Sequence, residues 1–176
     1  MKKLISPFLF LAGLATAAQA AVIIGTDVGY LVDSQEEYLT ARVGFEAARG
    51  ASFSHQVEFE VGYSEAAESG LSADLVPFLL NYRAVSAAEG AWGWYAGVGA
   101  GLARVSVDGV SIGGPVRLRD EAFAAQAFAG VTYAASSAVS LSLGAKYLWI
   151  DDVNFGGARF EVDDDVVLSA GISYRF

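Results

Sequence analysis

The chain contains no cysteine, a single histidine, one methionine and three prolines among 176 residues. Without cysteine, neither disulfide bonds nor an acylated cysteine of the lipoprotein type can hold or anchor the protein. The lone histidine, His55, leaves no spacing typical of a zinc site, and the sequence has no phosphate-binding glycine loop. These absences favour a protein with no cofactor and no metal of the common catalytic kinds.

Long uncharged runs are also scarce. Beyond the N-terminus there is one, residues 122–145. Gln126, Thr132 and several serines interrupt it, and its large side chains recur at every second position. This period is typical of β-strands, so the run predicts two strands and a turn instead of a transmembrane helix.

The first twenty residues, MKKLISPFLFLAGLATAAQA, combine two lysines, an apolar run and a small-residue end. They predict a secretory signal peptide over residues 1–20, cut between Ala20 and Ala21, and one domain over residues 21–176. A short membrane anchor is the alternative, but a spanning helix needs about 20 apolar residues. Loss of Lys2 and Lys3 changes the net charge from −9 to −11, which argues against nucleic acid as a partner.

Large apolar residues alternate with small or polar residues along most of the remaining chain, 54% of the whole being hydrophobic. Such alternation over about ten residues is typical of a membrane-spanning strand with one face toward lipid. Eight segments follow it: 22–32, 39–46, 53–63, 76–83, 94–102, 123–133, 139–149 and 166–176. The sequence therefore predicts an all-β fold, an eight-stranded antiparallel up-and-down transmembrane β-barrel.

Connection lengths and aromatic residues favour this barrel over a soluble β-sandwich, which is the alternative. The second, fourth and sixth connections are short, whereas residues 105–120 and 151–165 form long ones, as expected for loops outside the cell with both termini in the periplasm. The predicted outer rim carries Tyr30, Tyr63, Phe123 and Trp149. The predicted inner rim carries Phe45, Phe53, Tyr82, Trp92, Trp94, Tyr133, Tyr174 and Phe176, so the aromatics form two girdles.

Two stretches carry a family resemblance. Residues 92–105, WGWYAGVGAGLARV, and 123–151, FAAQAFAGVTYAASSAVSLSLGAKYLWID, with the closing YRF, resemble the small outer-membrane β-barrel family that includes opacity-type and OmpA-like barrels. The resemblance implies a porin-like barrel in the cell outer membrane of a Gram-negative bacterium. In that family the terminal aromatic resembles the signal read by the barrel-assembly machinery, which implies this role for Tyr174 and Phe176.

The predicted inward faces carry equal numbers of acids and bases. Because eight strands leave an interior only wide enough for side chains, these charges should pair and plug the barrel. A charged narrow pore or gate is the alternative. Gly97, Gly99 and Gly101 would leave space for longer side chains to reach across. The predicted interior charge network comprises Asp27, Arg42, Glu46, Glu58, Glu60, Arg83, Lys146 and Arg175.

Charged residues also gather in the predicted outer loops. Arg104, Arg117 and Arg119 bracket the third loop, and arginine suits phosphate groups, so we expect them to contact lipopolysaccharide. Pairing with Asp108, Asp120 or Glu121 is the alternative. The fourth loop contains runs of aspartate that could hold Ca²⁺, although their spacing matches no fixed calcium loop and solvated charge is favoured. Those residues are Asp151, Asp152, Asp163, Asp164 and Asp165.

These features favour a structural or surface-interaction role through the outer loops, with the outer membrane, lipopolysaccharide, the assembly machinery and host or surface ligands as partners. A narrow pore for ions or small solutes is the alternative. A lipid-modifying enzyme ranks third, because hydrolysis of the lipase type needs a nucleophile, a base and an orienting acid. His55 falls on the lipid face near the inner rim with Val57 two residues along, so we predict no enzyme activity.

Overall fold

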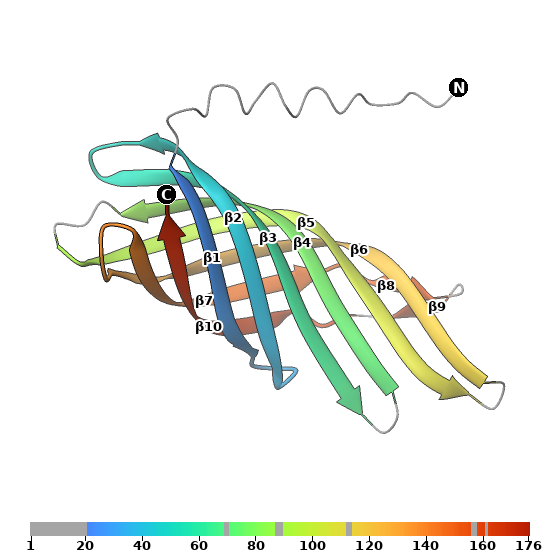
Figure 1. The fold of residues 1–176 in the computed structure, drawn as a ribbon. Helices are drawn as coiled ribbons and strands as arrows, with labels where there is room; N and C mark the ends of the chain where they lie inside the picture. Colours follow the sequence, from blue (N-terminus) through green and yellow to red (C-terminus); the bar gives the residue numbers. More distant parts are fainter. Residues whose placement is uncertain (1–20, 69–70, 87–89, 112–113, 156–157, 161) are drawn as a thin grey trace, which may run out of the picture.

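The computed structural model describes residues 21–68, 71–86, 90–111, 114–155, 158–160 and 162–176. Eight strands close into one antiparallel barrel in the order β1-β10-β7-β6-β5-β4-β3-β2, and β8 and β9 form a separate two-stranded sheet (Figure 1). The predicted eight-stranded up-and-down barrel is confirmed. Within the described ranges, no helix has the length and apolar character needed to cross a membrane. The predicted signal peptide, 1–20, lies outside the described residues.

The strands follow the period-two pattern of the sequence. The barrel strands are β1 (Val22–Leu31), β2 (Glu36–Arg49), β3 (Phe53–Glu68), β4 (Leu71–Ser86), β5 (Trp92–Ser111), β6 (Gly114–Ala134), β7 (Val139–Ile150) and β10 (Asp165–Arg175). The small hairpin consists of β8 (Val153–Phe155) and β9 (Ala158–Phe160). In the spanning part, burial alternates residue by residue, as expected when one face of a strand meets the lumen and the other meets the surroundings.

The first and last strands close the barrel. β1 pairs with β10 from Ile23 opposite Arg175 to Leu31 opposite Val167, and the Phe176 backbone N–H donates to the Val22 carbonyl at 2.9 Å. Closure leaves no unpaired edge along these strands. The C-terminus and the start of β1 therefore lie at one end of the barrel, here called the terminal end, and the opposite end is called the hairpin end (Figure 1).

Short turns join the strands at the terminal end. Between β2 and β3, the Gly50 N–H donates to the Phe53 carbonyl at 2.7 Å. Gly90, in the connection from β4 to β5, has a φ of 119°, a conformation that favours glycine. Between β6 and β7, the Ser136 hydroxyl oxygen accepts hydrogen bonds from the backbone of Ala138 and Val139 at 3.2 and 3.0 Å. Local turn chemistry thus sets these connections.

At the hairpin end the predicted long loop 105–120 is wrong. β5 continues to Ser111 and β6 begins at Gly114, so this stretch is a β-hairpin that extends the barrel wall. Its pairing persists because alternation persists, with Val105 and Val107 separated by Ser106 and followed by Asp108. β3 and β4 likewise extend to Glu68 and Leu71. Figure 1 shows both hairpins reaching well beyond the connection from β1 to β2.

The outer face of the barrel is apolar. Trp92, Val28 and Leu143 are 65%, 60% and 60% exposed, and many other large apolar residues are more than one-third exposed. Aromatic rings pair near both ends, Phe123 with Trp149 toward the hairpin end and Trp92 with Tyr133 toward the terminal end, with centroids 5.7 and 5.0 Å apart. A continuous apolar exterior bounded by aromatic rings suits a lipid environment.

Candidate functional site

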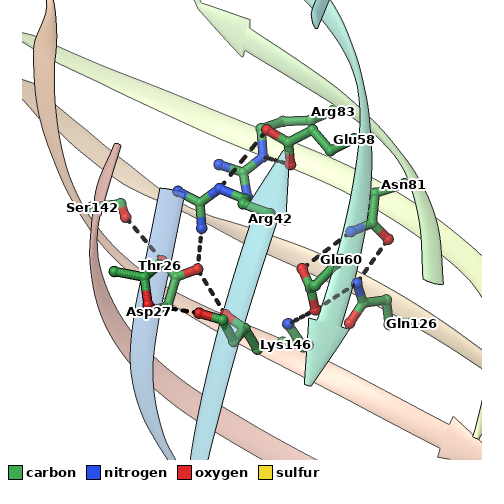
Figure 2. A network of polar contacts seen from close by, with 11 residues as sticks. Thr26, Asp27, Arg42, Glu58, Glu60, Asn81, Arg83, Gln126, Ser142 and Lys146 are labelled. Carbon is green, nitrogen blue, oxygen red and sulfur yellow. Dashed lines mark hydrogen bonds and ion pairs between the residues drawn. The ribbon is translucent and has the colours of Figure 1, made fainter. Parts of the chain in front are cut away.

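Four charged side chains form a chain of ion pairs along the inner face of four neighbouring strands, β1 to β4 (Figure 2). Arg42 from β2 pairs with Asp27 from β1, and its Nε lies 3.9 Å from Glu58 Oε1. Arg83 from β4 holds the other oxygen of Glu58, with 3.2 Å between Nε and Oε2. Glu58 is 1% exposed. Such a buried carboxylate depends on its cations, because loss of either would leave its charge poorly compensated.

Glu60 is the centre of a second cluster deeper toward the hairpin end. Lys146 from β7 pairs with its Oε1. Asn81 donates to Oε2 at 3.1 Å, and Gln126 donates to Oε1 at 3.3 Å and to the Asn81 carbonyl oxygen at 2.8 Å. The four side chains come from β3, β4, β6 and β7 and so connect opposite walls of the barrel (Figure 2). Glu60 thus has three donors and is fully buried.

Glycines on β5 make room for these side chains. A Cβ added to Gly99 would collide with the Asn81 amide, and one added to Gly97 would collide with the Phe128 ring. Phe128 and Tyr95 in turn lie against the Arg83 guanidinium, whose Cζ is 5.2 and 4.5 Å from the two ring centroids. The expected space above the β5 glycines is therefore filled by Phe128 and Asn81.

A third cluster surrounds Glu46 at the terminal end. Arg49 Nε and Nη2 donate to its two oxygens at 2.7 and 2.8 Å, Arg175 Nη1 lies 3.0 Å from Oε2, and the Ser54 hydroxyl donates at 2.7 Å. Sequence alternation missed Arg49, because its odd number assigns it to the outer face. A bulge between Glu46 and Ala48 shifts the register by one residue and turns Arg49 inward.

An apolar cluster closes the lumen beyond the charged layers, toward the hairpin end. Its residues face inward from the barrel strands and, in the case of Val153, from the small β8–β9 hairpin in the last connection. Sequence alternation did not reveal this layer, because here both faces of the strands are apolar. The cluster comprises Leu31, Tyr38, Leu79, Ala103, Ala122, Ala124, Leu148, Ile150, Val153 and Val167. The interior is therefore filled by two layers, one of ion pairs and one of buried apolar side chains.

Asp165 accepts hydrogen bonds from the connection between β1 and β2 at the hairpin end. Its two carboxylate oxygens accept from the backbone N–H groups of Asp33 and Ser34 at 3.0 and 2.9 Å, and from the Ser34 hydroxyl at 2.7 Å. Burial alone would raise the pKa of Asp165, but these bonds and one from the Val166 backbone outweigh burial and lower it. This predicted calcium-loop residue thus acts as an internal acceptor.

The lowered pKa of Asp165 predicts acid sensitivity. Because protonation is harder in the folded state, the carboxylate stabilises the fold above its usual unfolded pKa of about 3.9, and this contribution is lost as the pH falls through the lower folded value. Asp165→Asn should cost about 1 kcal/mol at neutral pH and flatten the acid limb of stability against pH. Urea unfolding from pH 7 to pH 2 measures both; Asp163→Asn, which changes an exposed residue of the same connection, is the control.

The remaining aspartates of this connection do not meet at one point among the described residues. Asp164 accepts a hydrogen bond from the Tyr147 hydroxyl, and Asp151 accepts from the Asp152 backbone at 2.9 Å. Within the described ranges, no group of three or more histidine, cysteine, aspartate or glutamate side chains could hold a metal ion. The arrangement therefore offers no support for the calcium alternative.

The three arginines expected at lipid headgroups lie on the extended hairpin. Arg104 is exposed on the outer face, and its Nη2 is 3.0 Å from Glu121 Oε1, which is one of the pairings weighed as the alternative. Arg119 is exposed opposite Ser106, and Arg117 stands opposite Asp108 in the register, its side chain lying outside the described set. The hairpin thus brings Arg104 and Arg119 onto one outer face of two neighbouring strands.

His55 lies on the outer face near the terminal end. Its Nδ1 is 2.6 Å from the Tyr82 hydroxyl, and the two rings stack with centroids 5.9 Å apart. Among the described residues, neither a serine hydroxyl nor a carboxylate is hydrogen-bonded to His55 or Tyr82. The pair therefore does not form a hydrolase triad.

Of the two residues predicted to carry the assembly signal, Tyr174 lies in β10 and Phe176 directly follows this strand. Tyr174 and Phe176 both point outward, with 47% and 70% of their surface uncovered. Their rings meet edge to face, with centroids 4.7 Å apart. They therefore form one exposed aromatic pair at the terminal end, whose only ring contact among the described residues is with each other.

No protein-family model and no curated protein matches this sequence. Solved structures do match it. Ail, the attachment invasion locus protein of Yersinia pestis, is 15% identical with a TM-score of 0.59 over 89% of this chain and 97% of its own. Neisserial surface protein A is 16% identical with a TM-score of 0.57 over 89% and 96%. The outer membrane enzyme PagL is 13% identical with a TM-score of 0.53 over 86% and 97%.

Sequence identities this low establish a shared fold and nothing about function. The three matched proteins include two named as surface or attachment proteins and one named as an enzyme, so the shared barrel does not by itself select a function. The predicted resemblance is confirmed at that level: the chain has the fold of the small eight-stranded outer-membrane β-barrels.

Proposed function

We propose that the protein is an integral, non-enzymatic barrel of the Gram-negative outer membrane, exported by a cleaved signal peptide over residues 1–20. The apolar exterior between two sets of aromatic rings supports insertion, and the matched solved structures support the outer membrane. With an even number of barrel strands both termini face the periplasm. The terminal end is then periplasmic, and the hairpin end is extracellular.

The barrel displays a β-sheet outside the cell. A tilted membrane strand needs about 9–11 residues, whereas β5 and β6 have 20 and 21. Roughly half of each strand therefore stands beyond the membrane, together with the ends of β3 and β4. This projection is the observation that carries a surface-interaction role, and the names of Ail and Neisserial surface protein A accord with such a role.

Shortening the projection tests the role. Replacing residues 106–119 by a two-residue turn leaves a β5–β6 pair of spanning length, so insertion should be unchanged. Cells carrying the native or shortened chain are compared for adhesion to immobilised extracellular-matrix proteins and sulfated polysaccharides. We expect cells with the native chain to adhere and cells with the shortened chain not to adhere. As a matched control, a variant with Ser136 and Ser137 in a periplasmic turn replaced by alanine should adhere normally. Equal adhesion by native and shortened chains would end the surface-interaction proposal.

The double plug argues against the pore alternative. Ions crossing the lumen would have to displace both the Glu60 cluster and the apolar cluster that ends at Val153. The purified barrel in a planar bilayer is expected to give no discrete conductance steps. Reproducible conductance steps that persist after the projection is shortened would indicate that the protein transports ions or solutes and would contradict the surface-interaction role.

We also propose lipopolysaccharide as a partner of the outer face. Arg104 and Arg119 are exposed beside the predicted outer leaflet, and arginine pairs with phosphate in a bidentate manner. Changing Arg104, Arg117 and Arg119 to alanine should lower co-purified lipopolysaccharide severalfold at low salt and less at high salt, because salt screens exposed charges. Lipopolysaccharide is quantified per mole of barrel, with Arg49→Ala as the periplasmic control. Equal amounts in both variants would contradict the contact.

A further inference from the structure

The ladder between β2 and β3 ends before either strand does. Its last described pair at the hairpin end is Leu39 opposite Tyr63, although β2 begins at Glu36 and β3 continues for five residues beyond Tyr63. Continuing the same register would place Glu37 directly opposite Glu65, and like charges at opposed positions destabilise a sheet. Beyond Tyr63, no strand among the described residues pairs with β3 on the side of β2. Residues 64–68 therefore form an open edge, here called the β3 edge.

The β3 edge presents backbone donors and acceptors to a further strand. The Phe53 carbonyl accepts from the Gly50 N–H in the turn from β2, so it points toward β2. β3 keeps one register with β4 from Phe53 to Glu68. Every second residue therefore points the same way, and Glu65 and Ala67 direct their N–H and C=O groups to the open side. Unpaired groups of this kind are a template for pairing with another chain.

The other side of the projecting sheet is less open. On β6, Pro115 has no N–H to offer. The Phe123 carbonyl accepts from the Asp151 N–H at 2.9 Å, and the Asn154 N–H donates to Asp120 at 2.6 Å. The chain leading into β8 thus already bonds to β6. The β3 edge is the better place for an added strand.

A hollow of about 570 Å³ lies on the outer face at the foot of the β3 edge. The carboxylates of Glu36, Glu37 and Glu65 and the rings of Tyr30 and Tyr63 line it, and its described lining contains no base. Glu65 accepts from the Tyr63 hydroxyl at 2.9 Å, so one carboxylate stands beside one ring. Within the described ranges no three acidic side chains converge closely enough for a metal ion. Carboxylates and aromatic rings together suit an organic cation.

We propose that the β3 edge binds an extended segment of a basic protein by strand addition. The segment pairs antiparallel with Glu65 and Ala67 above the start of β2, and one of its lysine or arginine side chains reaches into the hollow. There the cation lies between Glu37 and Glu65 and against the Tyr63 ring. Main-chain hydrogen bonds supply affinity and the basic side chain supplies selectivity. The like charges that keep β2 from pairing with β3 thus select the strand that pairs in its place.

Fluorescence anisotropy of labelled peptides with the purified barrel, in an uncharged maltoside detergent, tests the site. The first peptide has seven residues, alternating threonine and valine around one central arginine. The second carries glutamate in place of arginine. The third keeps the arginine but has every backbone N–H replaced by N-methyl, which removes its donors and keeps its charge. The native chain should bind the first peptide saturably at one site, at least roughly tenfold more tightly than either of the others.

Two variants of the chain locate the binding. Ala67→Pro removes an edge N–H that points away from β4, so the β3–β4 pairing stays while binding of the arginine peptide should fall roughly tenfold. Glu37→Gln should reduce the preference for arginine over glutamate severalfold. Glu121→Gln, which removes an exposed carboxylate beside Arg104, is the matched control and should leave this preference unaltered.

Three outcomes would overturn the proposal, and all are read with peptides alone or with exposed substitutions. They are no saturable binding of the arginine peptide, equal binding of the N-methylated peptide, which would mean that the hollow takes a cation without strand pairing, and an equal effect of Glu37→Gln and Glu121→Gln. The inference rests on the proposed surface role, because the partner has to reach the hairpin end from outside the cell. The chain shortened at residues 106–119 retains the β3 edge and should still bind the peptide, so failure of adhesion and failure of this site are distinguishable.

Discussion

Lys146→Met is expected to destabilise the barrel by on the order of 3 kcal/mol, the scale for breaking a buried ion pair by removing one partner. Lys146 is the only cation that pairs with Glu60 among the described residues, and the two side chains are 9% and 2% exposed. Asn81 and Gln126 would still donate to the carboxylate but could not neutralise it. The apolar cluster on the hairpin side keeps water away. Urea unfolding in detergent micelles, followed by tryptophan fluorescence, measures the change.

A second substitution separates the cost of an orphaned charge from lost packing. In Lys146→Met with Glu60→Gln the neutral amide still offers one acceptor oxygen, so at least half of the lost stability should return. Arg49→Ala, which breaks an exposed pair with Glu46 at the terminal end, should cost less than about 1 kcal/mol. An equal small cost for Lys146→Met and Arg49→Ala would mean that water reaches Glu60, and the lumen would then be wet.

The period-two pattern was sufficient to predict the barrel and the inward faces of its strands. It could not predict which charges meet. Arg42 stands opposite Glu60 in the register, yet Glu60 pairs with Lys146 across the lumen. In a barrel this narrow, inward side chains reach the far wall, so partners depend on strand tilt and side-chain length as well as on neighbouring strands.

Three features escaped the pattern for separate physical reasons. Arg49 turns inward through a one-residue bulge, which no alternation rule places in advance. The apolar cluster was hidden because a strand that is apolar on both faces, such as the YLWI of residues 147–150, gives no inward signal. The sequence predicts loops where the hairpins project, because a membrane strand is expected to end where its spanning length ends.

Deleting Phe176 is expected to lower the amount of inserted barrel in cells severalfold while hardly changing the stability of barrel that has folded. The structure separates the two effects. Phe176 is 70% exposed, its one ring contact among the described residues is with Tyr174, and its backbone contributes one hydrogen bond to Val22. Loss of that bond costs about 1 kcal/mol at most. A large loss of insertion would therefore reflect recognition of the terminal aromatic and not a weaker fold.

Both quantities can be measured on the same variants. Insertion is the heat-modifiable fraction of the chain in outer-membrane preparations, and stability is the urea midpoint of chain refolded into detergent without cellular factors. Phe176→Tyr keeps an aromatic ring and should insert normally, whereas Phe176→Ala keeps the backbone hydrogen bond and should fail as the deletion does. Normal insertion of Phe176→Ala would contradict the role of the ring. A fall in the refolded midpoint as large as the fall in insertion would instead assign Phe176 to barrel closure, through its hydrogen bond between β10 and β1.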